Sequence, residues 1–438
     1  MLLNCAGSIV PNQSVKERMR VVLAPRIDLH SGYHAIMLED RQSDYFVASP
    51  DHVFVSRDEV VSPYSDQHHG EFLSFGSGDS GLIIQSARLP VIGSRSWLVD
   101  TDDLLAGPLC GRMFLDSEFQ DNLKRLHSDD FLSFMKKRMR LMLSAYVHGS
   151  CAGIILRGDP DSSFDIARHW FSRLEVVELG EAYLEKVTAV KPARAPISWA
   201  DFEAKWNDLD ERRVVFCGRD FETKNGALAL EVMSHLMSEM EGLSFTYIGD
   251  IPDDFKNRSP HLVSRITHLP SVGRSEVIRE MQRSHVFFHP SKFETVGLSL
   301  IEAASCGMAV VSCSGVGLEF SKAIFHDGGA LLIDRTEADA HENPKFLAAL
   351  ESLLKQPDMM RSMGLANVLR SSRGDNSFDA QMEKIVGVRK IAASYRGDPF
   401  TIDHLGGLKA TVISSSRLFE LEDLKIKSRS GESIRVVI

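Results

Sequence analysis

The amino-acid sequence predicts an α/β protein built from two doubly wound domains. Its 438 residues exceed what one ordinary hydrophobic core holds, so two domains are expected. Short apolar runs mix with helical patterns along the chain, which is typical of doubly wound parallel sheets. The segment Lys191–Ser198 has two prolines and no periodicity, and therefore marks the boundary between the domains.

The composition narrows the class of protein. Apolar residues make up 43% of the chain and charged residues 25%, as in soluble globular proteins. The formal net charge of −10 argues against nucleic acid as a partner. The six cysteines are scattered without a Cys-x-x-Cys pair, which suits a reducing cytoplasm and offers no zinc framework. No apolar run is long enough to span a bilayer, and the first residues lack the pattern of a signal peptide.

Residues 1–195 contain the elements expected for the first domain. Apolar and β-branched runs predict strands, and apolar residues at helical spacing predict helices. The expected strands are Arg20–Ala24, Tyr45–Ala48, His52–Ser56, Leu82–Gln85, Trp97–Asp100, Ala152–Leu156 and Leu174–Leu179. One or two helices are expected within Glu118–Val147 and another at Ser163–Trp170.

Two motifs in this half have local interpretations. The sequence Gly-Ser-Gly-Asp-Ser-Gly at 76–81 matches a dinucleotide-binding fingerprint, but it leads into the strand-like Leu82–Ile84 rather than a helix. The same residues occur around some serine-protease nucleophiles, which the α/β pattern disfavours, so a turn is the better interpretation. His68 and His69, near Asp66, have no third ligand at suitable spacing, and a solvated loop is favoured over a metal site.

Residues that follow predicted strands are candidates for binding. Gly32, after the first strand, would let the backbone approach a ligand phosphate. Asp100, Asp102 and Asp103 could orient an acceptor hydroxyl or take its proton; an equally weighted alternative is a helix N-cap. The basic cluster at residues 136–140 is interpreted as a solvated helix face, with at most peripheral contact with an anionic membrane surface.

Residues 196–395 show a more regular pattern. The expected strands are Arg213–Cys217, Leu243–Gly249, Ile266–Leu269, His285–Phe288 and Ala309–Ser312. The expected helices are Ala227–Met240, Ser275–Arg283, Thr295–Ser305 and a closing helix at Asp379–Tyr395. Gly307 is expected to end the third of these. The remaining residues, 396–438, read as a short extension of β-strands.

The loop and helix start after His285–Phe288 carry the chemistry. Open α/β sheets bind ligands at the carboxyl ends of their strands. A helix that opens at Thr295 offers unpaired N–H groups and a positive dipole end to a phosphate, and Gly297 would let that phosphate approach closely. Glu294 and Glu302, eight residues apart, suit the hydroxyl groups of a sugar and a ribose.

Two cations lie on another strand-to-helix loop, which begins at Gly218. Arg219 and Lys224 would neutralise a diphosphate and stabilise the charge that develops on it as a leaving group. Each feature alone has an ordinary alternative, because glutamates at this spacing are common on solvated helix faces and cations are common on solvated loops. The combination predicts a sugar-nucleotide site.

The segment from Arg213 to about Arg373 resembles the nucleotide-sugar domain of retaining glycosyltransferases of family 4. The motifs that carry the resemblance are FCGRDFETKNG at Phe216–Gly226, FTYIGD at Phe245–Asp250 and HPSKFETVGLSLIEAASCGMAVV at His289–Val311. The resemblance implies the GT-B fold, in which two Rossmann-like domains face a central cleft. Those domains would be residues 1–195 and 196–395, followed by a β-rich extension at 396–438.

The resemblance also implies roles for single residues. Arg219 and Lys224 would grip the donor diphosphate, while Glu294 would hold the transferred sugar and Glu302 the ribose. The implied donor site is completed by Gly32, Gly218, Thr295, Val296, Gly297 and Leu298. The reaction would be a retaining hexosyl transfer in the cytoplasm that uses a nucleotide-diphosphate sugar and needs neither a metal nor a cofactor.

The chain departs from the family pattern in its acceptor half and at one donor position. Val296 stands where an aromatic residue is frequent, and the usual double glycine is reduced to Ser31-Gly32. His30 and His34 are both candidates for the first-domain histidine of many members. Two alternatives to a transferase are another GT-B enzyme, such as a phosphorylase or nucleotide-sugar epimerase, and an inactive GT-B binding protein. The acceptor is left open among glycans, small molecules, lipids and proteins.

Overall fold

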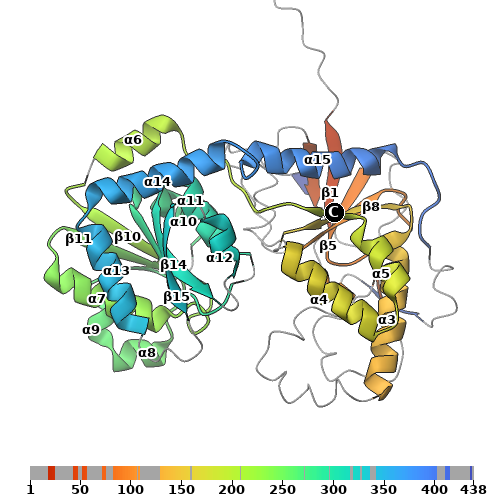
Figure 1. Ribbon diagram of the computed structural model, residues 1–438, viewed down its shortest axis with the longest axis horizontal. Coiled ribbons are helices and arrows are strands. Elements are labelled where there is room, and N and C mark those ends of the chain that lie inside the picture. The colour runs from red at the N-terminus through yellow and green to blue at the C-terminus, as the bar shows by residue number, and fades with distance from the viewer. Residues whose placement is uncertain are drawn as a thin grey trace, which may run out of the picture.

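The protein consists of two α/β halves that lie side by side (Figure 1). The computed structural model describes residues 18–24, 43–47, 52–56, 72–74, 82–105, 107–108, 129–157, 160–207, 209–270, 272–294, 296–315, 319–325, 328–335, 342–401, 410–414 and 435–436. Each half is built on its own parallel sheet, so the predicted fold class is confirmed.

A parallel sheet of seven strands forms the centre of the N-terminal half. Its order is β17, β2, β1, β5, β7, β8, β9. The strands span Met19–Ala24 (β1), Ser43–Val47 (β2), Leu82–Ala87 (β5), Trp97–Thr101 (β7), Cys151–Leu156 (β8), Val187–Ala189 (β9) and Arg435–Val436 (β17). All of the pairings between neighbours are parallel.

A four-stranded sheet brings the C-terminal extension onto the N-terminal half. Strand β3 (His52–Ser56) pairs antiparallel with β4 (Phe72–Ser74) and with β16 (Ala410–Ser414), while β4 pairs parallel with β6 (Val91–Ile92). Strand β17 similarly extends the larger sheet beyond β2. Strands predicted in the extension are therefore confirmed at these two places, and both add to sheets of the N-terminal half.

A six-stranded parallel sheet forms the centre of the C-terminal half. Its order is β12, β11, β10, β13, β14, β15. The strands span Arg212–Cys217 (β10), Leu243–Ile248 (β11), Thr267–Leu269 (β12), Val286–His289 (β13), Ala309–Gly315 (β14) and Ala330–Arg335 (β15). The apolar runs of the central strands β13 and β14 are buried on both faces, as parallel strands covered by helices require. The strands predicted in this half are confirmed.

Thirteen described helices cover these sheets. In the N-terminal half they are α3 (Asp129–Val147), α4 (Pro160–Arg173) and α5 (Val177–Leu184). In the C-terminal half they are α6 (Trp199–Asn207), α7 (Gly226–Glu239), α8 (Asp253–Arg258), α9 (Pro260–Val263), α10 (Arg274–Arg283), α11 (Leu298–Ser305), α12 (Glu319–Ile324), α13 (Glu342–Leu354) and α14 (Pro357–Ser372), followed by α15 (Phe378–Ser394). None of the helices in the described part of the chain has the length and apolar character needed to cross a membrane.

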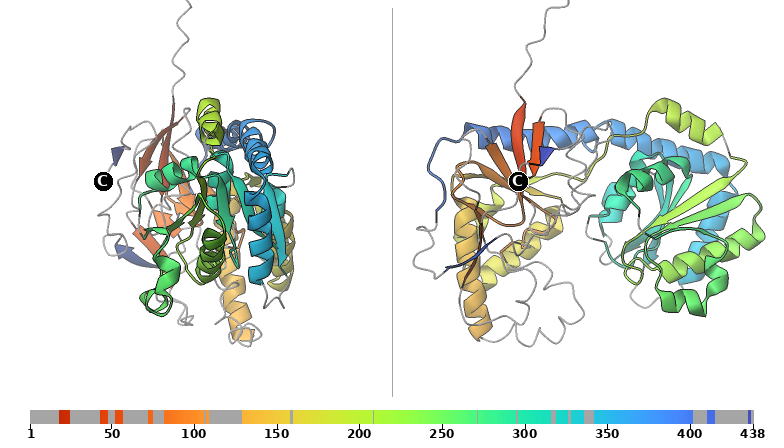
Figure 2. Two further views of the ribbon diagram at one scale, coloured as in Figure 1. Left: turned by 90° about the vertical axis from the view of Figure 1, so that its left-hand side faces the viewer. Right: turned by 180° about the vertical axis from the view of Figure 1, so that it is seen from behind.

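Helix α15 connects the two halves. It follows α14 of the C-terminal half but runs along the sheet of the N-terminal half (Figures 1 and 2). Its buried residues recur at helical spacing and pack on side chains from one face of that sheet: Phe378, Met382, Ile385, Val388 and Ala392 against Ile83, Leu98 and Ile155. Helices α3, α4 and α5 pack on the opposite face of this sheet. Successive strand residues point to opposite faces, and Ile84, Trp97 and Ile154 share a second core with residues of these three helices.

The strand predicted at Leu174–Leu179 is wrong. Residues 177–184 form helix α5, and the strand that completes the sheet comes later, at β9. Gly180 allows α5 to lie against α4, because a Cβ atom at this position would stand 2.2 Å from the ring of Phe171. The short apolar run looked like a buried strand, but Val177 is 49% exposed and the buried residues follow a helical period.

Candidate functional site

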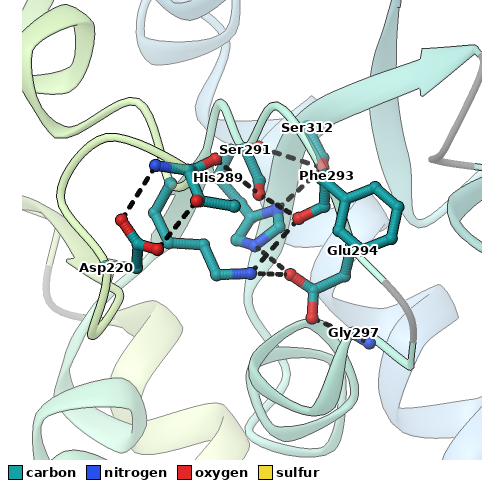
Figure 3. Close-up of polar contacts among 9 residues, drawn as sticks. Asp220, His289, Ser291, Phe293, Glu294, Gly297 and Ser312 are labelled. Carbon is teal, nitrogen blue, oxygen red and sulfur yellow. Dashed lines mark hydrogen bonds and ion pairs between the residues drawn. The ribbon is translucent and has the colours of Figure 1, made fainter. Parts of the chain in front are cut away.

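The candidate site lies where two neighbouring strands end. Strands β10 and β13 are parallel neighbours, so the loops that follow them leave the same edge of the sheet. These loops are joined directly: the backbone N–H of Lys292 donates to the carbonyl of Thr223 at 2.8 Å, and the Ser291 hydroxyl donates to the same carbonyl at 3.3 Å. The predicted cationic loop and the predicted phosphate loop are therefore in contact (Figure 3).

The loop after β10 is folded by its own side chains. Asp220 accepts hydrogen bonds from the N–H groups of Glu222 and Thr223 and from the Thr223 hydroxyl, at 2.8–3.1 Å. The bonds from Thr223 are the main cause of the lowered pKa of Asp220. At Gly218 the chain passes under the Lys224 side chain, and a Cβ atom there would lie 2.8 Å from Lys224 Cγ. Gly218 therefore allows Lys224 to cross the loop.

Lys224 reaches from this loop to the one after β13. Its ammonium group donates to the carbonyl of Phe293 at 3.3 Å and forms an ion pair with Oε2 of Glu294. The side chain is 20% exposed, so the charge is largely withdrawn from water. The structure thus brings together two residues that were predicted to serve one site, although they are far apart in the sequence.

Glu294 is held through both carboxylate oxygens. Oε1 accepts the backbone N–H of Gly297 at 3.1 Å, and Oε2 faces both Lys224 and Nε2 of His289, the latter at 3.5 Å. Burial would raise the pKa of Glu294, but the neighbouring His289 ring and the Lys224 ammonium group outweigh it and lower the pKa to about 2. The carboxylate is therefore ionised and oriented at neutral pH.

We expect the stability of the folded protein to depend on pH through the Glu294 carboxylate. Because its folded pKa lies near 2 rather than at the ordinary 4.5, its stabilising contribution is complete above pH 4.5 and is lost as the pH falls toward 2. The shift corresponds to about 3 kcal/mol. Thermal unfolding of wild type and Glu294→Gln should differ most above pH 5, and the difference should shrink by pH 3. Glu222→Gln, on the exposed part of the neighbouring loop, is the control. A difference in Tm between wild type and Glu294→Gln that does not change with pH would contradict the lowered pKa of Glu294.

The first turn of α11 opens beside Glu294. Gly297 has φ +61° and ψ +43°, a left-handed conformation that favours glycine, and Leu298 begins the helix. The first N–H groups of a helix have no partner within it, so this end suits an anion. The side chain of Val296 is 7% exposed and belongs to the core, which leaves its backbone as the part able to meet a ligand. Thr295 lies outside the described residues.

Glu302 lies within α11, about one turn after Leu298, and is 4% exposed. Its Oε1 forms an ion pair with Arg274, the first residue of α10, and lies 3.6 Å from Nη1 of Arg194 in the segment between the halves. The carboxylate predicted to bind ribose is therefore flanked by two guanidinium groups. The backbone N–H of Ile197 also donates to the carbonyl of Ser305 at 2.8 Å, which fixes the connecting segment to the end of α11.

Arg219 is exposed on the loop after β10. Its charge acts on the thiol at the end of β10. Burial raises the pKa of Cys217 to about 11, and the charges of Arg274, Arg219 and Lys224 act in the opposite direction. The end of β10 therefore lies in the field of three cations from two loops.

The predicted acceptor-side aspartates all have partners within the protein. Asp100 is 3% exposed and receives two hydrogen bonds from Arg157, both at 3.0 Å, and one from Gln85 at 2.9 Å. Gln85 in turn accepts from Arg389 of α15 at 2.8 Å. These contacts connect β7, β5, the end of β8 and α15, which gives Asp100 a place in the packing of the N-terminal half.

The other two aspartates make local contacts. Asp102 forms an ion pair with Arg88 at 2.8 Å. Asp103 accepts the backbone N–H of Leu105 at 2.9 Å, as a residue that caps a turn would, and burial raises its pKa. Other predictions for this half cannot be placed, because Gly32, His30, His34, His68, His69 and the 76–81 motif lie outside the described residues.

Sequence patterns missed several residues of this site. His289, Ser312, Arg274 and Arg194 contact the predicted glutamates or their partners. Arg274 could have been found from its position. A cation at the first residue of a helix is unfavourable next to the positive end of the helix dipole, which suggests that it has an anionic partner. His289 ends an apolar run immediately before a Pro-Ser loop, where a buried polar side chain is unusual.

The sequence of the C-terminal half matches a known domain. Residues 198–367 match the family model described as Glycosyl transferases group 1. The matched segment is similar to group 1 glycosyl transferases. It contains the complete six-stranded sheet and every residue of the site from Gly218 to Glu302, so the geometry described above lies within the matched segment.

Curated relatives match the chain only in part. A D-inositol 3-phosphate glycosyltransferase of Segniliparus rotundus is 25% identical over 174 residues, which are 38% of this chain and 37% of that protein. The phosphatidylinositol N-acetylglucosaminyltransferase gpi3 subunit of Schizosaccharomyces pombe is 31% identical over 103 residues, 23% of each chain. The chain thus spans well under two thirds of the length of these relatives.

Solved structures of similar architecture extend over most of the chain. WaaG, a glycosyltransferase involved in lipopolysaccharide biosynthesis, superposes with a TM-score of 0.51 at 13% identity and covers 85% of this chain and 99% of its own. A UDP-forming α,α-trehalose-phosphate synthase from Burkholderia xenovorans gives a TM-score of 0.50 at 12% identity, with 86% and 100% covered. These likenesses confirm the GT-B fold.

Proposed function

We propose that the protein is a retaining glycosyltransferase that moves a hexose from a nucleotide-diphosphate sugar to an acceptor hydroxyl. The observation that carries the proposal is the contact of Lys224 with Phe293 and Glu294, because it places a cation beside the opening of α11. The match of residues 198–367 to a glycosyl transferase domain supports the same reaction class. A cytoplasmic location belongs to this proposal and is supported by four free cysteines among the described residues.

In the proposed complex the donor diphosphate sits between Lys224, Arg219 and the first turn of α11. As the bond between the sugar and the phosphate loosens, negative charge grows on the leaving phosphate. Fixed cations and helix amides stabilise that charge more than they stabilise the bound substrate, and this difference accelerates the reaction. Lys224 then exchanges part of its contact with Glu294 for the diphosphate, and Glu294 turns to the hydroxyls of the sugar.

The acceptor attacks the face of the sugar that the phosphate leaves, so the configuration is retained and no protein nucleophile is needed. The leaving phosphate takes the acceptor proton. In this proposal the protein cations meet the diphosphate charge without a metal ion. Glu302 binds the ribose, and Arg274 and Arg194 hold that carboxylate in place.

A panel of nucleotide sugars tests the proposal. UDP, GDP and ADP, each alone and as its glucose, N-acetylglucosamine and mannose conjugates, are compared by thermal stabilisation and by slow hydrolysis in the presence of EDTA. We expect at least one conjugate to raise the Tm, since a ligand at 100 times its Kd stabilises by about 2.7 kcal/mol. Failure of every conjugate to stabilise the protein, or absorbance of bound pyridoxal phosphate, would overturn the assignment in favour of a binding protein or a phosphorylase.

Acceptors are tested with the donor that binds. The two relatives described above are named for transfer involving D-inositol 3-phosphate and phosphatidylinositol, so these two compounds are the first acceptors to try. Inversion at the anomeric carbon, measured by NMR on the product, would contradict the retaining course.

A further inference from the structure

His289 is buried beside the carboxylate that the proposed reaction uses. It is the last residue of β13 and is 1% exposed. Its Nε2 atom lies 3.5 Å from Oε2 of Glu294 and forms no hydrogen bond within the described part of the chain. On the other side of the ring, Nδ1 lies 3.2 Å from the hydroxyl of Ser312 on β14 (Figure 3). The imidazole ring therefore lies between Ser312 of β14 and Glu294 in the loop after β13.

The Ser312 hydroxyl has two acceptors within reach. It lies 3.1 Å from the carbonyl of His289 and 3.2 Å from Nδ1 of the same residue, because the two residues are direct neighbours across β13 and β14. A hydroxyl has one hydrogen to donate and two lone pairs to accept with. It therefore either donates to the carbonyl and accepts an N–H from Nδ1, or donates to Nδ1.

These two arrangements fix the state of the imidazole. If Ser312 donates to Nδ1, the ring is neutral and carries its proton on Nε2, toward Glu294. If Nδ1 donates to Ser312, the ring directs the Nε2 lone pair at a carboxylate, which is repulsive. In the favourable arrangement an N–H on Nε2 points at Glu294.

We propose that His289 is a positioning residue that holds Glu294 in the orientation needed for the sugar. This inference rests on the proposed function, in which Glu294 holds the transferred sugar. The charged groups that face the ring are Glu294 and, beyond that carboxylate, Lys224 of the β10–α7 loop; β14 contributes the Ser312 hydroxyl. When the donor draws Lys224 toward its diphosphate, His289 remains as the donor to Oε2.

The geometry is consistent with a contact that tightens during the reaction. At 3.5 Å the pair is at ion-pair distance and a few tenths of an ångström longer than an ordinary hydrogen bond. Contacts in unliganded active sites are often long and shorten when substrate binds. His289 also lowers the pKa of Glu294 and so helps to keep this carboxylate ionised, which supports the proposal.

Two nearly isosteric variants test the inference. In His289→Gln the amide nitrogen replaces Nε2 and keeps a donor toward Glu294, whereas in His289→Asn it replaces Nδ1 and the donor is lost. Hydrolysis of the nucleotide sugar that stabilises wild type is measured from pH 5 to 9, with His261→Asn on the exposed surface of α9 as the matched control. We expect His289→Asn to lower kcat about 10- to 100-fold with little change in KM, and His289→Gln to recover most of that loss. Equal losses in both variants would overturn the proposal.

A second measurement decides the geometry without any activity. The protein is labelled with ¹⁵N-histidine, and the ring signals of His289 are identified by their absence from His289→Asn. We expect the ring to carry a proton on Nε2, the nitrogen that faces Glu294. A neutral ring with its proton on Nδ1 would refute the inference. If wild type hydrolyses no nucleotide sugar, the proposed function fails, while this spectrum still shows whether His289 donates to Glu294.

Discussion

Lys224→Met should remove the thermal stabilisation by a nucleotide sugar and lower turnover by at least about 100-fold. Methionine fills a similar volume without charge, so the change removes the cation that contacts both the Phe293 carbonyl and the Glu294 carboxylate. The loss should appear in kcat more than in KM, because charge grows on the diphosphate as the transition state is approached. Differential scanning fluorimetry and steady-state kinetics with the same donor measure the two effects.

Folding must be separated from binding in this experiment. Lys224→Met leaves the largely buried Glu294 carboxylate without its ammonium partner, so the apoprotein will lose stability as well. The double variant Lys224→Met/Glu294→Gln removes both charges and should recover part of the lost Tm without recovering the ligand shift. Lys256→Met, on the exposed surface of α8, is the matched control. A ligand shift that persists in Lys224→Met would show that the diphosphate binds elsewhere.

The sequence predicted the sheet of the C-terminal half well, because its parallel strands are continuous apolar runs followed by amphipathic helices. It predicted most N-terminal strands but not their order, since strand order depends on which faces the helices cover. Helix α5 was mistaken for a strand because its apolar run is short, and the packing of Gly180 against Phe171 that allows a helix there cannot be seen in the sequence. The pairing of β16 with β3 joins residues at opposite ends of the chain and has no local signal.

In the candidate site, too, local features could be predicted from the sequence but contacts between distant segments could not. Spacing and residue type made Lys224, Glu294 and Glu302 candidates, because these features are local to the loops and the helix that follow strand ends. Their partners come from elsewhere: Arg194 belongs to the connecting segment and Ser312 to the neighbouring strand. Such contacts arise from the register of parallel strands and the path of the chain between the halves, so only the folded structure reveals them.

Asp100→Ala should destabilise the N-terminal half by about 3–5 kcal/mol, a typical cost of removing one partner of a buried ion pair. The carboxylate is 3% exposed and accepts two hydrogen bonds from Arg157 and one from Gln85, so its loss removes the negative charge that faces a buried guanidinium. Asp102→Ala is the matched control. Its pair with Arg88 is partly exposed, with side chains 23% and 32% accessible, and should contribute within about 1 kcal/mol.

The double variant Asp100→Leu/Arg157→Met distinguishes packing from catalysis. Replacing both members of a buried pair by apolar side chains of similar size often recovers stability, because no uncompensated charge remains. If Asp100 serves only the packing of β7 against β8, this variant should regain most of the Tm lost in Asp100→Ala, and its turnover should return with it. If Asp100 instead takes a proton from the acceptor, the double variant should fold and bind donor but stay inactive. Urea unfolding together with turnover therefore separates the two roles that the sequence left equally weighted.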